Sequence, residues 1–483
     1  MINLTPITNV IGVLSIIIGG FMLLCLPVSF IMESGDHMTF VYSAMITIGF
    51  GLLLYFARFK PVNNVNKREG MLIVSLGWLT MVTFSSVPYM ISGAIPSFTD
   101  AFFESMSGMT TTGASVLTDI ESVSSGVLFW RSLTQWIGGM GIIVLTVAIF
   151  PLLGIGGIEL FVAEAPGPTS DKIHPRIRET AKRLWLIYLG LTIALFVILT
   201  FGGMTVFDAI NHAFTTMATG GFSTKNASIA HYTSPLIQYP IIIFMFLAGT
   251  NYTVLYWSLK FKWYKVWKID EFKVYLGLVI VLVILITIPV HNISETGWEQ
   301  SFRDSLFQIV SLLTTTGFVS ADYTQWSESL TFIFFLIIFL GACAGSTAGG
   351  IKIIRHLVFF KNTYLEFKRI IHPRAIVPLK LNGQVVAPRI LTHVIIFLLL
   401  YLMTFLVGSI LVIMTGMDFL SAIGATATSI SNVGPGIGTV GPVDNFAAVP
   451  ATAKWILSFL MLLGRLELFT VLLLFTPFFW RSN

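Results

Sequence analysis

The sequence predicts an all-α polytopic membrane protein, with about ten transmembrane helices and four re-entrant pore half-helices in four pseudo-symmetric repeats. Three observations predict this class. The 483 residues are 55% hydrophobic and 11% charged, whereas soluble domains carry about 25% charged residues. Apolar runs of spanning length recur along the chain. Between them, a short motif that ends in glycine occurs four times.

The predicted spans are apolar runs long enough to cross a bilayer, which takes about 20 residues. They lie near 10–32, 38–57, 70–92, 126–153, 184–203, 236–258, 274–290, 330–360, 391–415 and 452–479. The first run lacks a basic leader and a clear cleavage site, so we expect a span there and not a signal peptide. Cys25 and Cys343 lie within apolar runs and offer no disulfide or zinc framework.

The basic residues predict the orientation of these spans. Lys and Arg gather in loops 58–70, 154–183, 260–273 and 352–389, whereas the loops on the other side contain only Lys225, Arg303 and Lys454. Cytoplasmic loops carry an excess of Lys and Arg. We therefore expect the basic loops and both termini in the cytoplasm, and the short motifs entering from outside.

The chain divides into a helix pair and four pore repeats of span, short segment and span. The pair covers 1–60, for which packing or assembly is the simplest role, and the repeats cover 69–153, 178–262, 272–361 and 390–480. The short apolar segments lie near 100–112, 208–220, 304–316 and 421–433. We expect re-entrant half-helices there, because irregular backbone at membrane depth needs protein or water around it.

Each short segment has a polar residue near its start and a glycine thirteen residues later. The starting residues are Asp100, Asp208, Asp304 and Ser421. We expect them to be the N-caps of the half-helices, because such side chains accept free backbone N–H groups. The C-terminal ends would then converge at mid-membrane, where their partial negative charge favours a cation.

The four tail segments, 110–113, 218–221, 314–317 and 431–434, can supply carbonyl oxygens to an ion. Threonine favours extended backbone and glycine reaches conformations closed to other residues. Carbonyl rings replace the hydration shell of potassium in channels, and no charged residue occurs in any tail segment. One copy would be explained by an ordinary helix cap, but four copies favour an ion filter. Its candidate residues are Thr111, Thr112, Gly113, Thr219, Gly220, Gly221, Thr315, Thr316, Gly317, Asn432, Val433 and Gly434.

The sequence resembles the superfamily of Trk, Ktr and HKT cation transporters, most closely its TrkH/TrkG-type bacterial potassium uptake membrane subunits. The stretches that carry the resemblance are Asp100-Ala101-Phe102-Phe103-Glu104-Ser105, Gly138-Gly139-Met140-Gly141-Ile142, Gly220-Gly221-Phe222-Ser223-Thr224, Gly341-Ala342-Cys343-Ala344-Gly345-Ser346-Thr347 and Gly464-Arg465-Leu466-Glu467. The resemblance covers nearly the whole chain. It implies potassium as the substrate, with no cofactor in this chain, and one filter glycine per repeat at Gly113, Gly221, Gly317 and Gly434. Sodium-favouring relatives often carry serine at the first of these positions.

The resemblance also implies a setting and partners. It implies a homodimer in the bacterial cytoplasmic (inner) membrane and a separate cytosolic, TrkA-like nucleotide-binding subunit. The basic loops could dock that subunit, or they could contact anionic lipid instead. The fourth tail segment departs most from the others, since Asn432 and Val433 replace threonines and Pro435 follows the glycine. We therefore expect an ion cage that is not strictly four-fold.

Two features predict control below the filter. Residues 341–350 contain four glycines, and each costs about 1 kcal/mol in a helix relative to alanine, so we expect a helix break in the third repeat alone. Tight small-residue packing is the alternative. The resemblance implies a pore-obstructing loop made of Ala342, Cys343, Ala344, Gly345, Ser346, Thr347, Ala348, Gly349 and Gly350.

The second feature is Arg465, which lies roughly 16 Å into the last run at helical rise. An intramembrane arginine defaults to the bundle interior or a cavity. We expect Arg465 to affect the pore, with an ion pair or a carbonyl anchor as the alternative. Arg131, in contrast, is expected to reach the outer surface.

Several readings remain open at this stage. Each charge that enters down 100 mV gains about 2.3 kcal/mol, so membrane potential alone could drive uptake, and proton coupling is neither required nor excluded. A sodium-permeable or sodium-coupled relative is the alternative. A polytopic membrane enzyme is remote, because Glu467 and Arg465 suggest no hydrolytic site. Gly154-Ile155-Gly156-Gly157 lacks the spacing of a nucleotide loop, and nothing points to nucleic acid.

Overall fold

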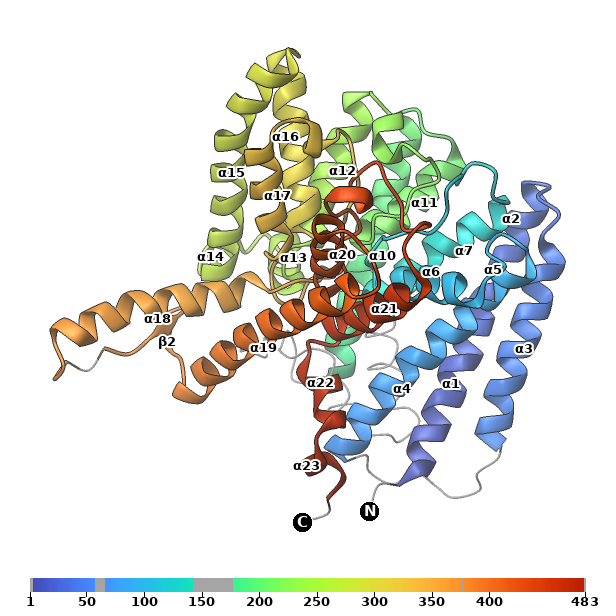
Figure 1. Ribbon diagram of the computed structural model, residues 1–483, viewed down its shortest axis with the longest axis horizontal. Helices are drawn as coiled ribbons and strands as arrows, with labels where there is room; N and C mark the ends of the chain where they lie inside the picture. Colours follow the sequence, from blue (N-terminus) through green and yellow to red (C-terminus); the bar gives the residue numbers. More distant parts are fainter. Residues whose placement is uncertain (1–2, 57–65, 142–176, 376, 482–483) are drawn as a thin grey trace.

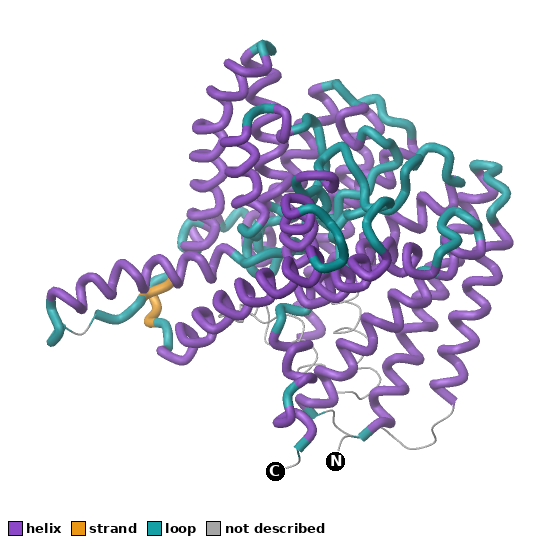
Figure 2. The backbone as a smooth tube through the Cα atoms, viewed as in Figure 1, coloured by secondary structure: helices purple, strands orange, loops and turns teal. Residues whose placement is uncertain are grey.

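The computed structural model describes residues 3–56, 66–141, 177–375 and 377–481, which form a helical body with one short hairpin. Figure 2 shows that helices make up most of this body and that the long loops gather in the upper half of the view. The end of the predicted span 126–153 and most of the basic loop 154–183 lie outside the described residues.

The N-terminal part is a pair of long helices at one edge of the body (Figure 1). α1 spans Leu4–Leu23 and α3 spans His37–Phe56, with the short α2, Cys25–Ile31, between them. A Cβ added to Gly51 would lie 2.6 Å from the Gly12 carbonyl oxygen. Small residues at such a crossing let two membrane helices touch along their backbones, and α1 then packs against α4.

The rest of the chain repeats one order of elements four times: a long helix, a short buried helix and an interrupted helix. The long helices are α4 (Lys67–Ser85, continued by α5, Val87–Ile91), α10 (Ile177–Phe201), α15 (Asp270–Ser294) and α19 (Pro388–Ile413). The short helices are α6 (Phe98–Met109), α11 (Val206–Met217), α16 (Trp298–Leu313) and α20 (Phe419–Ser431). The interrupted helices are α7 (Ser125–Trp136, then a π-helix over Ile137–Gly141), α12 and α13 (Pro235–Ala248, Tyr252–Leu259), α17 and α18 (Glu328–Ile338, Ile353–Ile371) and α21 and α22 (Ala451–Arg465, Phe469–Leu472).

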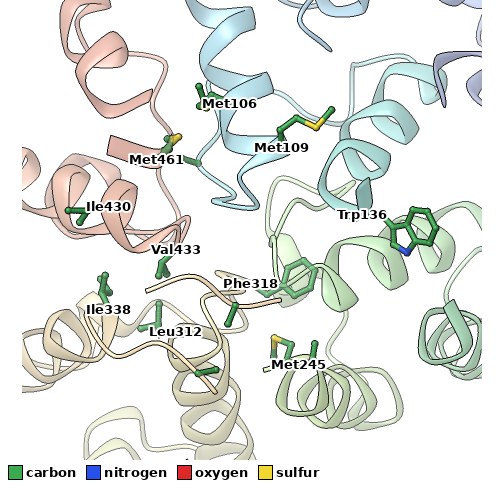
Figure 3. Packing of buried hydrophobic residues seen from close by; sticks show 14 of the residues in the cluster. Met106, Met109, Trp136, Met245, Leu312, Phe318, Ile338, Ile430, Val433 and Met461 are labelled. Atoms are coloured by element: carbon green, nitrogen blue, oxygen red, sulfur yellow. The ribbon is translucent and has the colours of Figure 1, made fainter. Parts of the chain in front are cut away.

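The short helices pack in a closed ring. Each contacts the spans before and after it in the chain, and each also contacts the interrupted helix of the preceding set: α11 meets α7, α16 meets α12, α20 meets α17, and α6 meets α21. Figure 3 shows buried side chains from these sets, including Met106, Leu312, Val433 and Met461, gathered in this core. The first and last sets are therefore neighbours, as closure of a ring requires.

The interrupted helices correct one prediction. The expectation that only the third repeat contains a break is wrong, because α12 and α13 meet at an angle of 110°, and α21 bends by 112° into the helical turns that follow it. Among the described residues, six helices are long and apolar enough to cross a membrane, or eight if each bent pair counts as one span. The predicted run 330–360 is split between α17 and α18.

The smaller elements lie at the ends of these helices. They are α14 (Trp263–Val266), α23 (Pro477–Trp480), the 3-10 turns Ser228–His231, Tyr323–Gln325, Gly438–Val440 and Leu473–Phe475, and strands β1 (Lys380–Leu381) and β2 (Gln384–Val385). The strands are antiparallel and join through Asn382-Gly383, whose φ angles are +51° and +81°. Positive φ at both residues is the type I′ geometry that suits a two-residue hairpin. The hairpin connects α18 and α19, which project from the body together (Figure 1).

Candidate functional site

The four short helices begin earlier than the sequence predicts. Ser97 caps α6 by accepting the Asp100 N–H, Thr205 caps α11, and Asp418 caps α20, while Gly297 precedes α16. Asp100, Asp208, Asp304 and Ser421 are therefore not the N-caps, and that prediction is wrong. A small polar residue three positions earlier supplies the cap in three of the four helices, because its oxygen reaches an N–H of the first turn.

The four residues that were predicted as caps instead contact the segments that follow the tail segments, or a neighbouring helix. Asp208 Oδ1 accepts from the Thr224 hydroxyl at 2.5 Å, and Ser421 Oγ accepts from the Thr439 backbone N–H at 2.8 Å. Asp100 pairs with the Lys454 Nζ at 2.7 Å, which ties the first set to the fourth. Asp304 accepts from Ser320 at 3.4 Å. Each of these bonds fixes a short helix against an outgoing or neighbouring segment.

All four short helices end in the same backbone turn. The N–H groups of Thr112, Gly220, Thr316 and Val433 donate to the carbonyls five residues earlier, at 2.8 to 2.9 Å. The preceding residues Thr111, Thr219, Thr315 and Asn432 have φ between +52° and +56°. This is the left-handed helix end in which glycine is usual. The expectation of extended threonines is therefore wrong at these positions.

Left-handed threonine is uncommon, because its branched side chain crowds the backbone there. Such residues cost of order 1–3 kcal/mol each and persist where the surroundings impose them. Thr111, Thr219 and Thr315 are all fully buried, so close packing is available to impose the conformation. Strained backbone of this kind clusters at functional sites, which makes the tail segments the strongest candidate site in the molecule.

The four glycines that end the tail segments form a ring. A Cβ added to Gly113 would lie 2.3 Å from the Gly220 carbonyl oxygen, and one added to Gly221 would lie 2.0 Å from the Thr316 oxygen. A Cβ on Gly317 would lie 2.9 Å from the Gly434 nitrogen, and one on Gly434 would lie 3.0 Å from the Gly113 carbonyl oxygen. The contacts run first to second, second to third, third to fourth, and fourth to first. The structure thus brings together four glycines from four separate parts of the sequence.

The segment 341–350 leaves and re-enters the body at one point. The Gly341 N–H donates to the Ile351 carbonyl at 2.9 Å, so the two ends of the segment lie side by side. Between them, the Thr347 hydroxyl reaches the carbonyls of Met217 and Ala248 at 3.2 Å. The Gly349 N–H donates to the Thr315 hydroxyl at 2.7 Å. The segment therefore touches the end of the second short helix and the third tail segment.

Arg465 lies at the end of α21 and joins three parts of the site. Its Nη1 donates to the Thr347 carbonyl at 2.9 Å and to the Thr111 hydroxyl at 3.2 Å. Its Nη2 donates to the carbonyls of Gly138 and Gly139 at 2.5 and 2.6 Å. The neighbouring Glu467 pairs with Arg355. Arg465 thus anchors backbone carbonyls and holds the 341–350 segment against the first tail segment.

Sequence reasoning missed two charged residues near the site, Glu271 and Lys352, and placed a third, Arg131, wrongly. Glu271 Oε1 accepts from the N–H groups of Ala344 and Ile354, at 2.7 and 3.2 Å, and Lys352 Nζ donates to the Ala348 carbonyl. Arg131 does not reach the outer surface as expected. It is buried and pairs with Glu104 at 2.6 Å. A buried charge needs a partner, and Glu104 lies inside a short apolar segment that the sequence analysis singled out, so this pair could have been found.

The site contains neither a disulfide nor a cluster typical of metal enzymes. Cys25 and Cys343 are free and buried. Among the residues that the structure describes, no group of three or more His, Cys, Asp or Glu side chains could hold a metal ion. The tail segments themselves supply backbone carbonyls, hydroxyls and the Asn432 amide, and no carboxylate.

Comparison with known proteins shows the family. The family model TrkH, described as a cation transport protein, matches residues 36–298 and 279–482. The Trk system potassium uptake proteins TrkH of Salmonella typhimurium and Escherichia coli K12 are each 42% identical over 481 residues, covering 99% of both chains. TrkG of E. coli K12 is 38% identical over 419 residues, covering 86% of each chain.

A solved structure agrees with the fold. The crystal structure of the potassium transporter TrkH from Vibrio parahaemolyticus superposes with a TM-score of 0.89 at 38% identity, and covers 99% of this chain and 100% of that one. The predicted all-α polytopic membrane fold and the predicted resemblance are therefore both confirmed. This chain belongs to the TrkH family of cation transport proteins.

Proposed function

We propose that this protein carries potassium ions into the cell across the cytoplasmic membrane, through a filter made of the four tail segments. The observation that carries the proposal is the closed ring of Gly113, Gly221, Gly317 and Gly434, each preceded by the same backbone turn. The relatives support the substrate, since curated proteins up to 42% identical over nearly the full chain are named potassium uptake proteins.

The chemistry of the ring suits a monovalent cation. The Gly220 carbonyl lies against Gly113 and the Thr316 carbonyl lies against Gly221. No charged residue occurs in the tail segments. Carbonyl oxygens can replace the water around potassium without a fixed charge, whereas calcium and magnesium favour carboxylate ligands. The short helices direct their negative dipole ends to the same place.

The proposed filter residues are the twelve candidates predicted from the sequence in the four tail segments. Ala342–Gly350 is proposed as a gating loop beneath them. The loop is tied to the third tail segment through Thr315 and to Arg465 through Thr347. Glu271 accepts from Ala344 within the loop and from Ile354 at the start of α18, which follows it. Because these bonds fasten the loop on several sides, the structure fits a closed gate, and conduction would require that some of them break.

We propose that membrane potential drives uptake, since 100 mV supplies about 2.3 kcal/mol per charge, or roughly fifty-fold accumulation. Coupling to protons is the competing mechanism. The four pore repeats at 69–153, 178–262, 272–361 and 390–480, a homodimer in the inner membrane and a TrkA-like cytosolic subunit complete the proposal. The names of the relatives refer to a Trk system, which fits a membrane subunit that works with others.

The test is ion flux into liposomes that contain the purified protein. We expect potassium and rubidium to enter faster than sodium under an inside-negative potential, and Gly113→Ser to move the preference toward sodium. A pH gradient applied without a potential separates proton coupling from electrical drive. Equal fluxes of sodium and potassium through the unmodified protein would favour the sodium-permeable alternative, and the absence of any cation flux would overturn the proposal.

A further inference from the structure

The second tail segment is held by a helix of the first repeat. We propose that Gln135 and Arg131, both on α7, are positioning residues that set cation selectivity by fixing the chain on either side of Gly221. The inference rests on the proposed function, because it assigns selectivity to a filter that includes this glycine. Neither residue is among the filter residues that the sequence predicts.

Gln135 bridges the filter glycine with its side-chain amide. Its Nε2 donates to the Gly220 carbonyl at 2.6 Å, and its Oε1 accepts from the Phe222 N–H at 3.0 Å. A Cβ added to Gly220 would lie 2.4 Å from the Gln135 Cδ. The amide thus occupies the space that a side chain at residue 220 would need. This accounts for glycine there, where the other tail segments carry Thr112, Thr316 and Val433.

The amide replaces a contact that the second tail segment lacks. In the first and third segments two hydroxyls bond each other at 2.8 Å, Thr110 with Thr112 and Thr314 with Thr316. The matching residues in the second segment are Ala218 and Gly220, which carry no hydroxyl. The second segment is therefore held by Gln135 of another helix, whereas the first and third segments are held by hydrogen bonds between their own threonines.

Arg131 extends this support one helical turn along α7, on the same face. Its Nη1 donates to the Ser223 carbonyl at 2.9 Å, and its guanidinium carbon lies 3.6 Å from the centre of the Phe222 ring. Its Nε pairs with Glu104, whose other oxygen accepts from the Val116 N–H at 2.8 Å. The outgoing chains of the first two segments are thereby joined through one buried ion pair.

The interrupted helix of the fourth repeat offers no such support. Gly138 and Gly464 are equivalent, since added Cβ atoms would meet the carbonyls of Met109 and Ile430, each four residues before its filter glycine. Gln135 lies three residues before Gly138, and the corresponding residue three positions before Gly464 is Met461. An apolar side chain there makes no amide contact. Selectivity depends on how the filter backbone is arranged around the ion, and Gln135 fixes that backbone on both sides of Gly221.

The test compares potassium and sodium permeability in proteoliposomes. We expect Gln135→Met, which keeps the side-chain size and removes both hydrogen bonds, to lower the potassium-to-sodium ratio roughly fivefold, the ratio that one net hydrogen bond supplies. Arg131→Lys keeps the charge beside Glu104 but loses the guanidinium fork, and a smaller fall is expected. Ser132→Ala is the control, since this buried hydroxyl bonds only the Leu128 carbonyl of its own helix among the contacts in the described residues.

The outcomes separate this inference from the proposed function. A lower ratio in Gln135→Met and Arg131→Lys, with Ser132→Ala unchanged, supports positioning. If Gln135→Met fails to fold, Arg131→Lys decides on the same readout. An unchanged ratio in a folded variant that conducts potassium overturns the positioning role and leaves the proposed function standing. The absence of potassium flux through the unmodified protein overturns both.

Discussion

The second and fourth tail segments reach the same ring by different means. Both follow a short helix that ends in the same backbone turn, with Thr219 and Asn432 in the left-handed conformation. Gly221 has φ of +79°, whereas Gly434 has no positive φ. Pro435 follows Gly434, and a proline disfavours helical conformations in the residue before it. The backbone turn is repeated in all four segments, but the chain that leaves it is not.

The contacts around the two segments differ as well. The residues nine positions before the four proposed filter glycines are Glu104, His212, Gln308 and Ala425. The first three bond the outgoing chain: Glu104 holds Val116, His212 Nε2 lies 2.9 Å from the Ser223 hydroxyl, and Gln308 donates to Ala321. Alanine cannot do so. The fourth segment is instead held by Asn432 Nδ2, which donates to Thr112 and to the Met461 carbonyl. Four-fold symmetry therefore describes the backbone turn and not the side chains that support it.

The largest expected effect on uptake comes from replacing Gly221 or Gly434 by alanine, because the space around these two glycines differs. A Cβ at Gly221 would lie 2.0 Å from the Thr316 oxygen and would also require a left-handed residue, which together cost about 2–5 kcal/mol. At Gly434 the nearest atoms are 3.0 Å away, and overpacking of that kind costs about 1–3 kcal/mol. We expect Gly221→Ala to abolish rubidium uptake and Gly434→Ala to retain part of it.

Uptake by cells and the melting temperature of the purified variants check this order. Gly277→Ala is a suitable control, because a Cβ there would meet nothing within 4 Å. If Gly434→Ala were more damaging than Gly221→Ala, the comparison between the segments would be wrong.

Much of the fold could be predicted, because the signals for it are local. Apolar runs and the interval from Asp100 to Gly113 depend only on nearby residues, and they located the short helices to within a few positions. The caps were misplaced because Ser97 and Thr205 are also good caps one turn earlier. The breaks after α12 and α21 were missed because one glycine, Gly249 or Gly464, marks each. The break at 341–350 was predicted, in contrast, because that segment has four glycines.

The supporting contacts could not be predicted, because they join distant residues. Gln135 and Gly220 are 85 positions apart, and Asn432 and Thr112 are 320 apart. The sequence around a glutamine on an apolar helix does not indicate which backbone carbonyl its side chain will bond. The pair Arg131 and Glu104 is the exception, since two charges in apolar segments each require a partner.

The proposed gating loop offers a comparison of the second and fourth repeats, with an intermediate effect. Thr347 joins it to the second and fourth repeats: its hydroxyl reaches Met217, just before the second tail segment, and its carbonyl accepts from Arg465 on α21 of the fourth repeat. Arg465→Gln removes a charge and several bonds to carbonyls, so we expect potassium flux to rise about tenfold, which is about 1.4 kcal/mol. Thr347→Val removes only the hydroxyl bonds and should raise flux by roughly two- to fivefold.

Flux through the two variants, measured at equal protein content in liposomes, checks this order. Thr363→Val is the matched control, since this exposed hydroxyl on α18 bonds the Phe359 carbonyl within its own helix. Unchanged flux in both variants would show that the loop does not restrict the pathway. A larger rise in Thr347→Val would show that the second repeat, and not the fourth, holds the loop.

The smallest expected effect belongs to Thr219→Asn, one half of an exchange of the left-handed residues between the two segments. Asparagine adopts this conformation more readily than a branched residue, and the Thr219 hydroxyl bonds the adjacent Ala218 carbonyl, so Thr219→Asn should stabilise the fold by roughly 0.5–1 kcal/mol. Asn432→Thr should destabilise it by about 1–3 kcal/mol, because it adds strain and removes the bonds to Thr112 and Met461. Melting temperatures of the two variants and of the double exchange check these signs. If both single variants shifted the melting temperature in the same direction, local backbone strain would not distinguish the two segments, and their difference would reside in the outgoing chains that Gln135 and Pro435 constrain.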